Sequence, residues 1–322
     1  MRILITGGAG FIGSFLTERL VSLGYSVVVI DNLSSGDLGR LGQVIDRITF
    51  VKDDLKNPRN PEAFQGIDSV FHLAANPEVR LSVTEPRIHF DENIVATFNV
   101  LELSRKYGVK NIVYASSSTV YGDAKVLPTP PEDHPIQPIS VYGAAKTAGE
   151  IMCGTYTRLY GINCVALRYA NIVGPRLRHG IIYDLLMKLK RDPNELEVLG
   201  DGTQEKSYIY ITDTINATLM AWEHAARNSG IYVYNVGNWD LINVREIVNI
   251  IVKVSGFNPR ITYRPATPDG RGWPGDVKRM LLSIDKIVRE VGWRPSMSSK
   301  DAIETTAKAL SQELGVGKWL KS

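Results

Sequence analysis

Hydrophobic residues in the first half of the chain form short continuous runs, separated by longer segments in which they recur at helical spacing. The runs are 2–6, 26–30, 48–50, 69–75, 111–118 and 163–170, and the clearest helical segments are 11–23, 91–107 and 142–160. Continuous apolar runs are typical of strands that are covered on both faces. The alternation therefore predicts an α/β fold with a Rossmann-type, doubly wound parallel sheet.

This rhythm breaks at GPRLRHG, residues 174–180, and the pattern that follows is different. Helical spacing returns at 181–191, 213–227, 243–255 and 299–314, with short strand-like pieces between these segments. We predict a Rossmann domain over 1–170 and a smaller C-terminal α/β domain over 171–322, some of whose segments return to the first sheet. Three prolines and three glycines in 265–276 predict an ordered loop.

Composition narrows the class of protein. The 322 residues include only two cysteines, which excludes a disulfide framework and a four-cysteine zinc site. The 37 Lys and Arg against 34 Asp and Glu give a net charge of +3, too small to indicate a nucleic acid or membrane partner. No apolar run is long enough to cross a bilayer or to form a secretory signal, so we expect a cytoplasmic protein. The five histidines lack metal-ligand spacing, and no metal is expected.

A glycine cluster follows the first run and opens the first helical segment. In TGGAGFIG, Gly7, Gly10 and Gly13 give the spacing at which a chain turns tightly and brings its backbone to a pyrophosphate. Asp31 lies eighteen residues past Gly13, at the end of the second run, where a carboxylate accepts from both ribose hydroxyls and repels a 2′-phosphate. The pattern predicts NAD rather than NADP. Plain turn roles for the glycines and Asp31 are the alternative, and Asp54 is either an acceptor for the adenine amino group or an ordinary loop residue.

A second constellation combines Tyr142 and Lys146, which are one helical turn apart, with Ser117 at the end of the fifth run. A phenol must lose about three pKa units to act as a base near neutrality, which requires about 4 kcal/mol. One positive charge about 5 Å away contributes about 3 kcal/mol at an effective dielectric constant of about 20. Lys146 and an oxidised nicotinamide ring would together be enough. The hydroxyl of Ser117 can share a proton with a substrate oxygen.

Six ordered motifs together resemble the extended short-chain dehydrogenase/reductase family, and within it the UDP-glucose (UDP-galactose) 4-epimerase branch. They are TGGAGFIG, the aspartate after the second run, HLAA, SSSTVYG, YGAAK and RYANIVGPR. The resemblance implies NAD, a nucleotide-sugar substrate, a homodimer and the catalytic set Ser117, Tyr142 and Lys146. The predicted cofactor residues are Gly7, Gly10, Phe11, Ile12, Gly13, Asp31, Asn32, Ser35, Gly36, Asp54, Leu55, Leu73, Ala74, Ala75, Asn93, Tyr142 and Lys146.

The resemblance also suggests the reaction. Related dehydratases carry Asp-Glu after the active hydroxyl, whereas this chain has Ser118-Thr119, which favours epimerisation over dehydration. The expected reaction is epimerisation at C4 of a UDP-sugar, with hydride removal to NAD, rotation of the 4-keto sugar and hydride return. The alternatives are a UDP-glucuronate or UDP-N-acetylglucosamine 4-epimerase, a nucleotide-sugar reductase, or a non-catalytic NAD-binding regulatory protein.

Positions that match the family's substrate contacts lie mostly in the second half. The predicted substrate residues are Ser117, Ser118, Tyr142, Asn171, Val198, Lys206, Arg271, Asp276 and Met280. Lys206 stands where arginine is common, and a lysine brings charge without a bidentate fork. Trp273 occupies the position where the family usually has an arginine, so Arg271 can serve only if its loop bends differently. The flexible Met280 suggests that 2-acetamido sugars are also accepted, with a core methionine as the alternative.

Apolar positions on the helical segments leave the oligomeric state open. Ile94, Val95, Phe98 and Leu101, together with positions in 142–160, form either a helix-bundle dimer interface or the faces that pack on the sheet.

Overall fold

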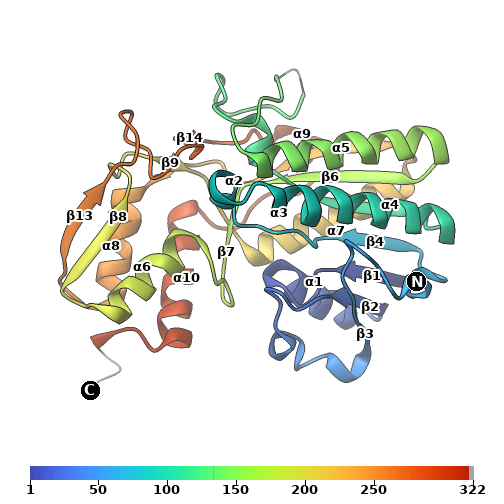
Figure 1. Ribbon diagram of the computed structural model, residues 1–322, viewed down its shortest axis with the longest axis horizontal. Coiled ribbons are helices and arrows are strands. Elements are labelled where there is room, and N and C mark those ends of the chain that lie inside the picture. Colours follow the sequence, from blue (N-terminus) through green and yellow to red (C-terminus); the bar gives the residue numbers. More distant parts are fainter. Residues whose placement is uncertain (133, 319–322) are drawn as a thin grey trace.

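Seven parallel strands form the central sheet of the computed structural model, which describes residues 1–132 and 134–318 (Figure 1). The strands run in the order β11-β6-β5-β4-β1-β2-β3, and every neighbouring pair is parallel. Their bounds are β1 Arg2–Thr6, β2 Ser26–Asp31, β3 Ile48–Lys52, β4 Ser69–His72, β5 Asn111–Ser117, β6 Asn163–Tyr169 and β11 Ile231–Val236. The strand order reverses between β1 and β4, which creates the crevice where sheets of this kind bind ligands.

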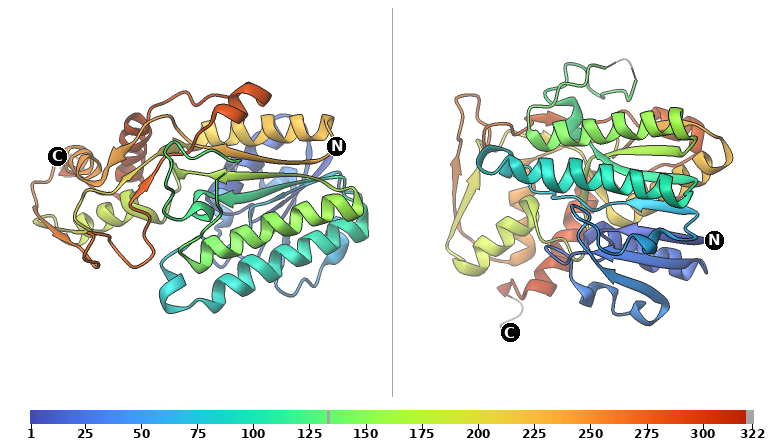
Figure 2. Two further views of the ribbon diagram at one scale, coloured as in Figure 1. Left: turned by 90° about the horizontal axis from the view of Figure 1, so that it is seen from above. Right: turned by 45° about the vertical axis from the view of Figure 1, so that its right-hand side comes forward.

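Helices cover both faces of this sheet, as the continuous apolar runs predict. Two of them, α4 (Ala96–Tyr107) and α5 (Val141–Tyr160), lie side by side on one face, and α1 (Phe11–Ser22) and α7 (Ile211–Arg227) cover the other (Figure 2). Side chains alternate between the two layers along each strand. On β1, for example, Leu4 belongs to the cluster beneath α4 and α5, whereas its neighbours Ile3 and Ile5 pack with α1 and α7. The predicted doubly wound fold is confirmed.

The connection from β4 to α4 is less regular than the sequence predicts. Two short helices, α2 (Leu81–Thr84) and α3 (Arg87–His89), come before a π-helical segment, η4 (Phe90–Val95). The segment expected as one helix over 91–107 therefore begins with a wider turn. Short 3-10 segments complete this half: η1 Leu38–Leu41, η2 Ile45–Arg47, η3 Pro61–Phe64 and η5 Ser118–Tyr121.

The second lobe has its own hydrophobic core beneath three helices and several short strands. The helices are α6 Gly180–Arg191, α8 Val244–Ser255 and α10 Ser299–Leu314. The strands are β7 Asn171–Val173, β8 Glu195–Leu199, β9 Glu205–Lys206, β10 Tyr208–Tyr210, β12 Ile242–Asn243, β13 Arg260–Arg264 and β14 Arg279–Met280, paired as β10-β7, β12-β9-β14 and β13-β8.

The chain crosses between the two lobes several times. After β10 it returns to the first lobe as α7 and β11, and after β14 it returns again as α9 (Asp285–Val291), which packs against β11 and α7. The second lobe therefore begins near residue 170. The boundary there does not divide the chain into two continuous domains, because later segments return to the first lobe. Within the described residues, none of the helices is long and apolar enough to cross a membrane.

Candidate active site

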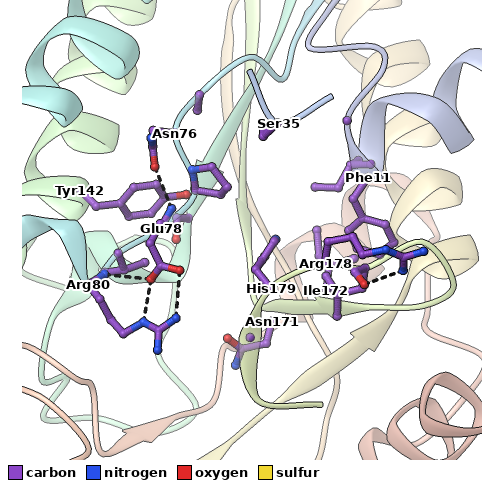
Figure 3. A pocket seen from close by; sticks show the side chains of 18 of the residues that line it. Phe11, Ser35, Asn76, Glu78, Arg80, Tyr142, Asn171, Ile172, Arg178 and His179 are labelled. Atoms are coloured by element: carbon purple, nitrogen blue, oxygen red, sulfur yellow. Dashed lines mark hydrogen bonds and ion pairs between the residues drawn. The ribbon is translucent and has the colours of Figure 1, made fainter. Parts of the chain in front are cut away.

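A cavity of about 1070 Å³ lies between the carboxyl edge of the sheet and the second lobe. Figure 3 shows Tyr142, Asn76 and Glu78 on one wall, with Phe11 and Arg178 on the opposite wall. This volume is at the upper end of the range for small-molecule sites and suits two ligands side by side.

The glycine turn between β1 and α1 forms one end of the cavity. Gly7 has a φ of +70°, and a Cβ there would stand 2.8 Å from the backbone nitrogen of Ala74. A Cβ on Gly13 would stand 2.1 Å from the carbonyl oxygen of Gly7. Both positions thus require glycine, and glycines at a turn before a helix allow a pyrophosphate to approach the backbone N–H groups of the first helical turn.

Asp31 ends β2 at the same edge and is held by the backbone. Its carboxylate accepts from Ala9 N at 2.9 Å and from Leu33 N at 2.8 Å. Burial raises the pKa of Asp31 above its usual value, while those two hydrogen bonds and the charge of Arg40 oppose the rise. A Cβ on Gly36 would stand 2.7 Å from Asp31 Oδ1. Each carboxylate oxygen keeps acceptor capacity for a ribose hydroxyl.

Most of the predicted cofactor residues line the cavity. They are Gly7, Gly10, Phe11, Ile12, Gly13, Asp31, Asn32, Ser35, Asp54, Leu55, Leu73, Ala74, Ala75, Tyr142 and Lys146. Gly36 and Asn93 are not among the lining residues. The side chain of Asn93 accepts from Asn76 N at 2.7 Å and so holds a loop that does line the cavity.

Ser117, Tyr142 and Lys146 meet at the middle of the cavity. The α5 helix that carries Tyr142 and Lys146 begins at a cap in which Ser140 Oγ accepts from Gly143 N at 3.0 Å. Lys146 Nζ donates to the carbonyl oxygen of Ala115 at 2.8 Å and lies 5.7 Å from the centre of the Tyr142 ring. Ser117 Oγ accepts from Thr119 Oγ1 at 3.0 Å. The sequence spacing thus corresponds to a real cluster.

The pKa values in this cluster differ from the ordinary values on which the sequence argument rests. Burial raises the pKa of Tyr142 to about 12, and the hydrogen bond with Ser117 only partly opposes this rise. Burial also lowers the pKa of Lys146 to about 8, against the charge of Glu150, which raises it. At pH 7 the protein alone holds a neutral phenol beside a lysine that is mostly charged. Reaching the phenolate at neutral pH then requires about five pKa units, or about 7 kcal/mol, rather than three units.

The second lobe contributes Asn171, Val198, Lys206 and Asp276 to the cavity. Lys206 Nζ and Asp276 Oδ1 pair at 2.6 Å, so these two predicted substrate residues also bind each other. Asn171 Nδ2 donates to the carbonyl oxygen of Ser207 at 3.1 Å, which fixes its amide beside the cavity. Ser118, at the start of η5, lines the first-lobe side.

Two predicted substrate residues lie outside the cavity lining. The guanidinium of Arg271 pairs with Asp123 at 3.0 Å and with Asp269 at 2.6 Å, and it donates to the carbonyl oxygen of Asp276 at 2.6 Å. Arg271 therefore supports Asp276 rather than facing the cavity. Met280 is 7% exposed and packs in the first core, the alternative raised for it from the sequence.

Sequence reasoning missed the segment Asn76–Arg80, which lines the cavity after β4. Glu78 forms a bidentate pair with Arg80, with Oε1 2.9 Å from Nε and Oε2 3.1 Å from Nη2, and Arg80 also lies 3.6 Å from Asp184 on α6. The pairing with Arg80 lowers the pKa of Glu78. The segment comes just after the HLAA run and so lies at the carboxyl edge of the sheet. That position is the signal that could have revealed the segment from the sequence.

The glycine turn and the carboxylate of Asp31, next to a Ser–Tyr–Lys cluster at the same sheet edge, are the features that define nicotinamide-dependent enzymes of the short-chain dehydrogenase/reductase class. In the described part of the chain, no group of three or more His, Cys, Asp or Glu residues could hold a metal ion.

Comparisons with known proteins place the chain within this class. The chain belongs to the NAD dependent epimerase/dehydratase family, whose model matches residues 3–237. A UDP-glucose 4-epimerase of Mycolicibacterium smegmatis is 32% identical over 316 residues, covering 96% of this chain and 98% of the relative.

Two solved structures are similar along nearly the whole chain. A UDP-galactose 4-epimerase has a TM-score of 0.88 at 53% identity, covering 98% of this chain and 100% of that one. A UDP-glucuronic acid 4-epimerase of Bacillus cereus, in complex with UDP-glucuronic acid and NAD, has a TM-score of 0.87 at 30% identity, covering 97% and 100%. The cofactor is NAD, in agreement with the open glycine turn and with Asp31.

Proposed function

We propose that this protein interconverts UDP-glucose and UDP-galactose by epimerisation at C4. The observation that carries the proposal is that one cavity is lined by Tyr142 and Ser117 from the first lobe and by the Lys206–Asp276 pair from the second. High identity to a UDP-galactose 4-epimerase supports the same substrate.

In this mechanism Tyr142 exchanges the proton of the sugar 4-hydroxyl at its phenolic oxygen, and Ser117 bridges the two oxygens. When bound, NAD supplies the chemistry of accepting hydrogen from C4 and returning it. Lys146 holds a positive charge beside the phenol and has donors left for a ribose, because Ala115 takes only one of its three N–H groups. Lys206 contributes positive charge toward a diphosphate, and Asn171 and Asp276 bind the sugar or ribose.

The charges that line the cavity favour a neutral hexose over a uronate. Arg80 is paired with Glu78, Lys206 with Asp276, and Arg178 with Glu313 at 2.9 Å. A sugar carboxylate would have to share one of these three cations with the carboxylate that already pairs with it. Dehydration is also disfavoured, because Glu78, the carboxyl in the Asn76–Arg80 segment, is held ionised by Arg80 and has no proton to donate.

The test is product analysis on UDP-glucose, UDP-glucuronate and UDP-N-acetylglucosamine, each incubated separately with the NAD-loaded protein. We expect UDP-galactose from UDP-glucose, a transient absorbance of reduced nicotinamide and no net consumption of added NAD. The predicted activity on the 2-acetamido sugar remains to be tested by the same panel. Conversion of the uronate alone, or stoichiometric oxidation of NADPH, would contradict the proposal.

We also propose that the protein is a homodimer that pairs through α4 and α5. These helices lie side by side and present Phe98, Ile151, Leu159 and Tyr160 to the outside, with Ile151 64% and Leu159 66% exposed. Leu101, on the same segment as Phe98, is buried against the sheet. In this proposal Phe98 belongs to the dimer interface, whereas Leu101 packs on the sheet. Exposed apolar side chains on paired helices fit a second copy of this chain.

A further inference from the structure

A buried ion pair lies directly behind the Ser–Tyr–Lys cluster. Glu150 follows Lys146 by one turn of α5, and its carboxylate accepts from Arg168 Nε at 2.9 Å and from Nη2 at 2.7 Å. The side chains of Arg168 and Glu150 are 7% and 9% exposed. Burying two charges costs about as much free energy as their pairing returns, so stability alone gives a weak reason for such a pair.

The pair is tied to the strand that carries Ser117. The hydroxyl of Ser116 donates to Glu150 Oε1, and the carbonyl of Ala115 accepts from Lys146. Two consecutive residues of β5 thus hold two residues of α5 one turn apart, immediately before Ser117.

Arg168 is fixed in turn from its other side. Its Nη1 donates to Tyr121 Oη at 2.7 Å and to the carbonyl oxygen of Pro131 at 2.9 Å, and Tyr121 Oη donates to Asn235 Oδ1 at 2.7 Å. The carboxylate of Glu150 therefore has no freedom to leave its place.

Glu150 is also the anion that acts on Lys146. The other titratable groups facing Lys146 are Tyr142 on α5, Tyr114 on β5, His72 on β4 and His89 on α3. Burial lowers the pKa of both histidines and raises the pKa of both phenols, so all four are neutral near pH 7. Among the described residues, only Glu150 has a charge that favours the ammonium form of Lys146.

We propose that Glu150 is a positioning residue, which through its fixed carboxylate keeps Lys146 charged and aligned beside Tyr142. The inference rests on the proposed function for its catalytic consequence, but the charge state of Lys146 can be measured without turnover.

Glu150→Gln preserves the size and much of the hydrogen bonding of the side chain and removes its charge. We expect the midpoint of Lys146 deprotonation to fall by about one pH unit, because part of the attraction is already offset by Arg168. The readout is the pH dependence of acetylation of Lys146 by acetic anhydride, followed by peptide mass spectrometry. In turnover of UDP-glucose, the rate at pH 8 relative to pH 6.5 should drop about fourfold, while KM changes little.

Two variants separate this role from a structural one. Tyr121→Phe removes a hydroxyl from the far side of the network and keeps the Glu150 charge, so the Lys146 midpoint should stay. Glu150→Asp keeps the charge, so its Lys146 midpoint should lie close to that of the wild type. If Glu150→Gln does not fold, the double variant Glu150→Gln/Arg168→Met removes both charges and should still lower the midpoint.

An unchanged Lys146 midpoint in the folded Gln or double variant would overturn the inference. If the wild type lacks epimerase activity while Glu150→Gln shifts the Lys146 midpoint as expected, the proposed function would be refuted. The role of Glu150 toward Lys146 would then stand.

Discussion

At the scale of single residues, Tyr142, the proposed base, lies in surroundings that oppose its ionisation. Burial raises the pKa of Tyr142 to about 12, and the side chain that partly opposes this is Ser117. A general base works best when its pKa lies near the operating pH, so the proposed role requires bound partners to lower this pKa. The residue is therefore suited to exchanging a proton only inside a complete complex.

Tyr142→Phe removes the proton-carrying oxygen and leaves the ring in place. We expect turnover of UDP-glucose to fall by two or more orders of magnitude, since general acid–base catalysis contributes about 10²–10⁴-fold, while the dissociation constant of the UDP-sugar changes little. Turnover is measured by product formation and binding by calorimetry. Near-normal turnover would exclude Tyr142 as the base.

At the scale of elements, the sequence predicts the regular parts best. The strands, the glycine turn and the Ser–Tyr–Lys cluster depend on local periodicity and on the shared edge to which parallel strands deliver their ends. The predicted helix at 91–107 starts differently in the structure, because its first residues belong to a π-helical segment. In that segment Asn93 is buried and bonds to the loop at Asn76, a feature that hydrophobic periodicity cannot show.

The ion pairs between residues far apart in the chain were equally beyond prediction. Arg271 faces Asp123, which is 148 residues away in the chain, and the Lys206–Asp276 pair spans 70 residues. Such pairings depend on how the loops fold over the second lobe. The position of Met280 in the core has the same origin, because β14 runs beside β9 and places that side chain inward.

His72 joins three elements and gives the fold a pH dependence. On β4, its ring nitrogens bond to Thr6 Oγ1 on β1 at 2.7 Å and to Thr97 Oγ1 on α4 at 2.9 Å. Burial, helped by the charge of Lys146, lowers the pKa of His72 to about 3. Below about pH 6.5 His72 is protonated in the unfolded chain but stays neutral in the folded protein. This group therefore lowers stability as the pH falls from about 6.5 toward 3.

Between pH 7.5 and 4.5 we expect His72 to reduce the free energy of unfolding by about 2–3 kcal/mol. The measurement is urea denaturation at both pH values. His72→Gln should be less stable at pH 7.5 but should lose less stability on acidification than the wild type does. His134→Gln, in the loop before α5, serves as the control and should keep the wild-type dependence. Equal losses in wild type and His72→Gln would rule out this role.

At the scale of the whole molecule, both lobes contribute residues to the lining of one cavity. The first lobe holds Tyr142 and the NAD turn, whereas the second supplies Lys206 and Asp276. The near balance of charge over the chain, +3, agrees with this arrangement, because the cations of the cavity act locally and are matched by carboxylates.

The proposed dimer is a whole-molecule prediction. Light scattering should give twice the chain mass of 35.7 kDa for the wild type. Ile151→Glu, on the exposed face of α5, should shift the mass toward that of one chain, because a buried charge without a partner opposes association. Met220→Glu, at a 37% exposed site on α7, is the matched control and should leave the mass unchanged. A monomeric wild type, or a dimer that Ile151→Glu does not weaken, would refute this interface.

The repeated crossing of the chain between the lobes restricts how the gene for such a protein can recombine. A gene fragment that ends near residue 170 would encode a sheet without β11 and α7, leaving the β6 edge unpaired and one hydrophobic face covered by α1 alone. The remaining fragment would have a strand and two helices without their sheet. Recombination at the apparent boundary would thus produce two unstable halves. We therefore expect new substrate preferences to arise by substitution within the cavity rather than by exchange of the second lobe as a unit.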